Sequence, residues 1–116
     1  MLSIKVKIDR TKLQSIYEQY KLIAQTFEPD DSHEQLLFAG IIRQTKEFQK
    51  ILLRNHDNFT LSMDEVDCLM FYQLWNEKID VRGLNIWTQV CLQKISDAIH
   101  KKSVEPAGKS NTIIID

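Results

Sequence analysis

The sequence predicts a mainly α protein: a four-helix, bundle-like domain with a small two-stranded β element formed by the N- and C-terminal segments. Three observations predict this class. Four segments carry apolar side chains at helical spacing or on every side of a helix. Short polar segments connect them, as in helical bundles. The two terminal segments carry short apolar stretches that are typical of strands.

Residues 3–8 alternate apolar and charged side chains, which predicts a half-buried strand that needs a partner. Asp9 or Thr11 can cap a helix over 11–27. The apolar side chains of that helix fall within about 120° of one another, and Leu22 is the single exception. The proline-containing acidic turn that follows ends the helix.

A second helix is predicted over 33–55, capped by Asp31 or Ser32. One face carries a stripe of mixed charges, and the opposite apolar face is wide enough to contact more than one neighbour. Gly40 lies inside this helix, where glycine costs about 1 kcal/mol relative to alanine. We therefore expect another helix to approach closely at Gly40.

Ser62 and Glu65 match a Ser-x-x-Glu capping box, which predicts a third helix over 63–79 after a polar loop at 55–61. The first turns of this helix are apolar on nearly every side. A helix of that kind must be covered on every side. It is either the centre of the bundle or part of a surface shared with another chain.

A fourth helix is predicted over 84–102, antiparallel to the third because the connection between them is short. Ile86 and Val90 form a second, smaller apolar strip on its back. Residues 1–102 are thus expected to form one helical domain, and 103–116 a linker with an apolar tail. We expect residues 112–115 to pair with residues 3–8, within one chain or between two, with a frayed tail as the alternative.

Neither a cofactor nor a metal site is predicted. Asp97 and His100 have the spacing of one metal-binding pair of a di-iron bundle, but the helical wheel points both to water. Cys68 and Cys91 lack an inward histidine and are expected as reduced core thiols.

The sequence does not predict an enzyme. A nucleophilic cysteine needs an adjacent base. His33 and His56 lie at opposite ends of the second helix, and Cys68 lies almost two turns into the third. Only three glycines are present, none in a strand–loop–helix context that could bind phosphate.

Composition gives further expectations. A chain of 116 residues, 43% apolar and 27% charged, is typical of a single globular domain. No apolar run approaches the roughly 18 residues of a membrane span. Without an export signal, we expect a cytoplasmic protein. The overall pattern is in the style of small bacterial helical proteins, although no motif carries that likeness.

The leading functional hypothesis is a non-enzymatic interaction, scaffold or adaptor domain that forms a homodimer or binds another protein. Four helices in a bundle normally need one apolar stripe each, and this chain carries a surplus. The alternative is that the strand pair and the tail cover the surplus within one chain. The candidate interface residues are Phe71, Tyr72, Trp75, Ile86, Val90, Ile113, Ile114 and Ile115.

A nucleic-acid-binding regulator is the second hypothesis. If the terminal segments pair, their basic side chains could form one patch, although the net charge of −1 gives no overall attraction. The predicted helix pair 63–79 and 84–102 has a helix-turn-helix outline, but its second helix offers few donors to base edges. The candidate residues are Lys5, Lys7, Arg10, Lys12, Lys101 and Lys102.

Overall fold

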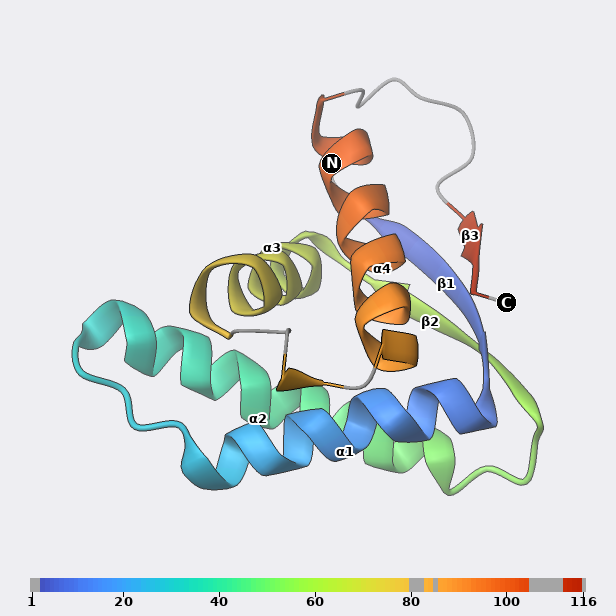
Figure 1. The fold of residues 1–116 in the computed structure, drawn as a ribbon, viewed down its shortest axis with the longest axis horizontal. Coiled ribbons are helices and arrows are strands. Elements are labelled where there is room, and N and C mark those ends of the chain that lie inside the picture. The colour runs from blue at the N-terminus through green and yellow to red at the C-terminus, as the bar shows by residue number, and fades with distance from the viewer. Residues whose placement is uncertain (1–2, 80–82, 85, 105–111, 116) are drawn as a thin grey trace.

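The computed structural model describes residues 3–79, 83–84, 86–104 and 112–115, and its mainly α character agrees with the prediction. Four α-helices surround one face of a small sheet (Figure 1). The elements in chain order are β1 (Ile4–Asp9), α1 (Arg10–Thr26), α2 (Ser32–Leu52), β2 (Asn58–Met63), α3 (Glu65–Gln73), the π-helical turn η1 (Leu74–Lys78), α4 (Ile86–Val104) and β3 (Thr112–Ile114).

The sheet has three strands in the order β2-β1-β3, not the two strands expected. The predicted pairing of the terminal segments is confirmed, because β3 runs parallel to β1 with Lys5 opposite Thr112. The additional strand, β2, is antiparallel to β1 and lies in a segment predicted partly as a loop. In β2 the buried Phe59, Leu61 and Met63 alternate with exposed polar residues, which is the pattern of a strand with one wet face.

The predicted capping box at Ser62 and Glu65 is wrong. Ser62 belongs to β2, whose pairing with β1 continues to Met63, so the chain remains extended there. Helix α3 begins after Asp64, whose carboxylate accepts from the Asp67 backbone N–H at 2.9 Å. The Asp67 carboxylate accepts in turn from the Asp64 N–H at 3.3 Å. The capping box therefore exists, but it lies two residues further along the chain.

Replacing Asp64 by alanine should lower the free energy of unfolding by about 0.5–2 kcal/mol, whereas asparagine should cost much less because it also caps helices. The hydrogen bond from the Asp67 backbone holds the pKa of Asp64 below its ordinary value of 3.8. The carboxylate thus stabilises the fold above that pH, and its contribution is lost as the pH falls through the lowered pKa. Urea unfolding of the wild type and of Asp64→Ala, at neutral and at acidic pH, measures the difference in their free energies of unfolding. A difference between wild type and Asp64→Ala that does not shrink in acid would contradict it.

The aromatic centre of the core joins α1, α2 and η1. The Tyr20 ring lies edge-on to Phe48 and Trp75, with centroids 5.0 Å and 5.5 Å away. The Tyr20 hydroxyl donates to Gln44 Oε1 at 2.8 Å and accepts from Trp75 Nε1 at 3.3 Å. Burial raises the pKa of Tyr20 far above its usual range, so the hydroxyl stays protonated and can donate.

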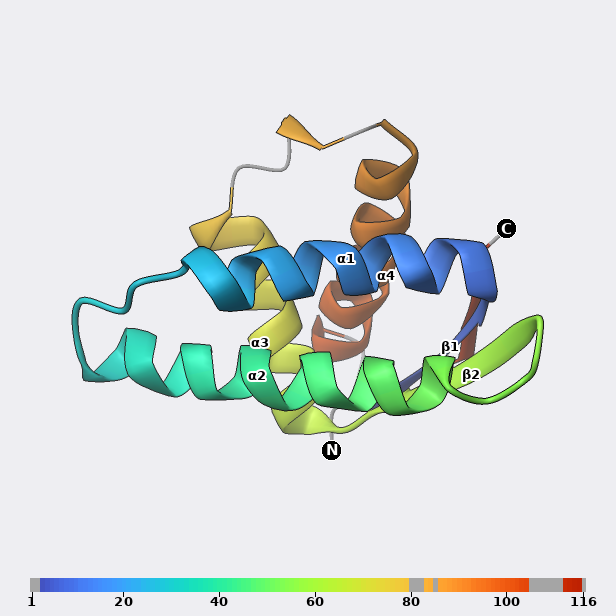
Figure 2. The ribbon, with the colours of Figure 1, turned by 90° about the horizontal axis from the view of Figure 1, so that it is seen from below.

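The helices do not reproduce a simple bundle, and that part of the prediction is not confirmed. Helices α1 and α2 lie side by side (Figure 2), whereas α4 packs against β1 and α3 against β2. The expected close approach at Gly40 is present. A Cβ added at Gly40 would lie 3.0 Å from Met70 Sδ, so α2 and α3 could not pack this closely around a larger side chain without moving Met70.

Candidate interaction surface

Helix α3 is apolar on nearly every side, but the described part of the chain covers it on one side only. Cys68 and Phe71 are buried, whereas Val66 is 49% and Leu69 is 56% exposed. Leu36 on the neighbouring α2 is 63% exposed. We call Leu36, Val66 and Leu69 the α2–α3 patch. Large exposed aliphatic side chains gathered on two adjacent helices are typical of an interaction surface.

A shallow apolar groove of about 170 Å³ separates α2 from α3 at this patch. Its lining residues are Leu36, Ala39, Gly40, Arg43, Gln44, Val66, Asp67 and Met70. The glycine and the alanine keep one wall low, because neither has a side chain large enough to fill the groove. The groove could therefore receive one or two apolar side chains from another molecule.

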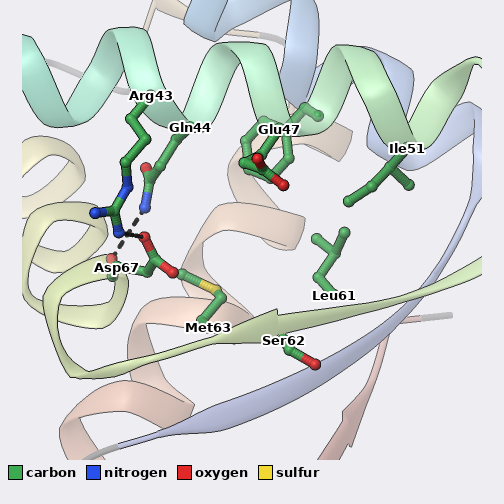
Figure 3. A pocket seen from close by; sticks show the side chains of 9 residues that line it. Arg43, Gln44, Glu47, Ile51, Leu61, Ser62, Met63 and Asp67 are labelled. Carbon is green, nitrogen blue, oxygen red and sulfur yellow. Dashed lines mark hydrogen bonds and ion pairs between the residues drawn. The ribbon is translucent and has the colours of Figure 1, made fainter.

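A second groove, of about 280 Å³, lies between α2 and β2 (Figure 3). Its lining residues are Arg43, Gln44, Glu47, Phe48, Ile51, Leu61, Ser62, Met63 and Asp67. Arg43, Gln44 and Asp67 line both grooves, so the two are neighbours. Arg43 Nη2 lies 2.5 Å from Asp67 Oδ1 and 3.9 Å from Asp64 Oδ1. The hydrogen bond with Asp67 raises the pKa of Arg43, so the guanidinium stays charged at the junction of the grooves.

The structure places the eight candidate interface residues in three environments. Phe71, Trp75 and Ile115 are core residues, because none is more than 4% exposed. Tyr72, which stacks on His100, and Ile113 are half-buried. Ile86, Val90 and Ile114 are exposed, and the first two form the predicted strip on α4. Only these last three could be reached readily by another molecule.

Sequence reasoning did not single out the three residues of the α2–α3 patch. The available signal was the apolar circumference of the third helix, which predicted a cover on every side and so did not distinguish the face that carries Val66 and Leu69. Trp87 on α4 is also exposed, at 41%, with the Lys12 ammonium 5.6 Å from its ring centre.

The six candidate basic residues have different roles. Lys5 and Lys7 are exposed on the outer face of the sheet. Arg10 instead turns toward the end of α2, where it donates to the carbonyls of Leu52, Arg54 and His56. Lys12 forms an ion pair with Asp9 at 2.6 Å. Lys101 is exposed and Lys102 is half-buried, both on α4. Arg10 and Lys12 therefore bind partners within the chain and are not available as free positive charges.

The cysteines and histidines do not converge on one site. Burial raises the pKa of Cys68 to about 12, so this thiol is protonated at neutral pH. His33 contacts Gln73, and His56 lies against Phe59. Asp97 accepts from Gln93 on its own helix. Within the described ranges, no cluster of three potential metal ligands occurs. No helix among the described residues is long and apolar enough to cross a membrane.

No family model, curated protein or solved structure matches the chain. Function must therefore be inferred from the surface of the chain itself.

Proposed function

We propose that the protein is a non-enzymatic interaction domain with a scaffold or adaptor role, and that it self-associates as a dimer. One observation carries this proposal: α3 is apolar on nearly every side and exposes Val66 and Leu69. Exposed aliphatic side chains in such a group normally mark a contact with another molecule. Leu36 extends the same patch onto α2.

The charges around the patch support a second copy of the chain as the partner. A two-fold interface brings the same surface together twice, so it must complement itself. The rim of the patch carries both signs, with Arg43 beside the carboxylates of Asp64 and Asp67. The two cysteines are free, buried thiols, which supports a reducing, cytoplasmic location as part of the proposal.

Nucleic-acid binding, the alternative, has less support. Arg10 and Lys12 have partners within the chain, so the lysine-rich face is smaller than the sequence suggested. Lys5 and Lys7 remain exposed on the sheet. Binding to nucleic acid through them would weaken steeply with added salt.

The substitution Leu69→Asp should dissociate the dimer, because it would bury a charge in an apolar contact. We expect the dissociation constant to rise at least about tenfold, equivalent to about 1.4 kcal/mol. Light scattering over a dilution series measures this change. Leu22→Asp on α1 is the matched control, because Leu22 is 54% exposed and lies outside the patch.

The outcomes separate the possibilities. Monomeric wild-type protein at every concentration would refute self-association. A dimer that resists Leu69→Asp but dissociates with Ile86→Asp would move the interface to the strip on α4. Equal effects of Leu69→Asp and Leu22→Asp would show a general loss of stability instead of a specific contact.

A further inference from the structure

One long edge of the sheet belongs to β2, and the hydrogen-bonding groups on that edge can be assigned. Lys7 O accepts from Ile115 N, so the backbone N–H and C=O groups of the odd-numbered residues of β1 point toward β3. Arg10 N donates to Asp57 O, so the backbone groups of the even-numbered residues of β1 point toward β2. Phe59, Leu61 and Met63 lie opposite these even-numbered residues, so their own backbone groups point toward β1. The N–H and C=O groups of Thr60 and Ser62 point outward from the sheet.

This edge lacks the features by which proteins usually prevent strand addition. Such features are charged side chains, proline, bulges or a very short edge strand. Strand β2 is six residues long, contains no charged residue, proline or glycine, and pairs with β1 in an unbroken register. The opposite edge, β3, has three residues. The edge of β2 is therefore the better template for an added strand.

The inner side of the edge adjoins the groove between β2 and α2. Leu61 and Met63 point from β2 toward α2, and Ser62 points away (Figure 3). Phe48 and Ile51 on α2 also line the groove. A strand added to β2 would direct alternate side chains to this side of the sheet. Those side chains would need to be apolar.

The outer side of the edge is basic. Lys5 lies opposite Ser62 and Lys7 lies opposite Thr60. In the part of the chain that the structure describes, neither lysine forms an ion pair. The small Ser62 and Thr60 leave space above them, so a lysine could reach an acidic side chain two strands away, about 10 Å. Asp9, at the end of the same face, is neutralised by Lys12.

We infer that the edge of β2 binds an extended peptide with alternating apolar and acidic side chains. The peptide backbone would bond to Thr60 and Ser62 as a fourth strand. Its apolar side chains would enter the groove beside α2, and its acidic side chains would face Lys5 and Lys7. This site does not depend on self-association through the α2–α3 patch.

A fluorescein-labelled peptide of four Glu-Val repeats is the probe, with anisotropy as the readout. Thr60→Pro removes an outward N–H, and edge strands tolerate proline at such positions, so the pairing of β1 with β2 should persist. Circular dichroism checks that it does. We expect Thr60→Pro to weaken binding at least about tenfold, since it removes one hydrogen bond and hinders another. Thr60→Ala keeps the N–H and should bind as the wild type does.

The charge requirement has its own comparison. Lys5→Gln with Lys7→Gln should weaken binding of the Glu-Val peptide about fivefold, as expected for two exposed ion pairs. The same variant should bind a Gln-Val peptide as the wild type does. Lys46→Gln with Lys94→Gln removes equal charge from α2 and α4 and should leave both affinities unchanged.

Three results would overturn the inference. The first is the absence of saturable binding to the wild type at peptide concentrations of order 1 mM. The second is unchanged binding by Thr60→Pro or by the Lys5 and Lys7 variant. The third is evidence that a different molecule occupies the edge of β2. An oligonucleotide that requires Lys5 and Lys7 but not the Thr60 N–H would assign the face to nucleic acid. A dimer that Thr60→Pro dissociates would assign the edge to a second copy.

Discussion

Replacing Trp75 by alanine is expected to lower the free energy of unfolding by about 3–5 kcal/mol, as for other large aromatic side chains removed from a core. The Trp75 side chain is 4% exposed and lies edge-on to Tyr20. Its indole N–H also donates to the Tyr20 hydroxyl. Alanine would leave a cavity where α1 and η1 meet. Urea unfolding followed by circular dichroism measures the change.

Trp87→Ala is the matched control, because this second tryptophan is 41% exposed. It should cost about 1 kcal/mol, in proportion to the smaller apolar area that it buries. If Trp75 were an interface residue, its removal would change the oligomeric state and leave monomer stability nearly unchanged. That result would contradict the core position of Trp75.

Arg10→Ala should lower the free energy of unfolding by about 2–3 kcal/mol. Helix ends leave backbone carbonyls without partners, and Arg10 donates to three carbonyls at and after the end of α2. Hydrogen bonds to charged groups contribute about 1.5–3 kcal/mol each, but three that share one side chain do not add in full. Arg10 also lies 5.1 Å from the Phe59 ring centre, so its loss would loosen β2 as well. Thermal and urea unfolding provide the measurement.

Arg10→Lys distinguishes charge from geometry. A lysine keeps the positive charge but cannot reach three carbonyls with one planar group. It should recover less than half of the loss, and Lys7→Ala on the exposed face should cost almost nothing. Full recovery by lysine would mean that charge at the helix end matters more than the hydrogen bonds.

Local patterns predicted much of the fold. The period of two in β1 and the helical period in α1 are visible without any tertiary contact, and so is Asp9 as a helix cap. The partner of the N-terminal strand also followed from composition, because three isoleucines in the C-terminal segment need a sheet.

Strand β2 could not be predicted in the same way, because its formation depends on β1, some fifty residues earlier. Its outward residues are Asn58, Thr60 and Ser62, which locally favour a loop. The overlapping Ser-x-x-Glu pattern also favoured an earlier helix start. Long-range pairing decided between the two, and that pairing leaves no local signal.

The apolar character of the third helix was evident from the sequence, but the side chains that stay exposed on it were not. The apolar circumference of the third helix predicted that this helix is covered on every side, either at the centre of the bundle or by another chain. It could not show that Tyr20 would cover the side with Phe71 and Trp75 and leave Val66 and Leu69 exposed. That choice depends on how α1 lies across α3, which is a property of the whole core.

The parallel pairing of β1 with β3 has a consequence for folding during synthesis. The ribosome completes β2 about fifty residues before β3, which at 5–20 residues per second is roughly 2–10 s. During that interval β1 can pair with β2, but its other edge has no strand beside it. Lys5 and Lys7 lie on β1, whose second edge is unpaired during this interval. Their charges would discourage pairing with a neighbouring nascent chain until the isoleucines of β3 arrive.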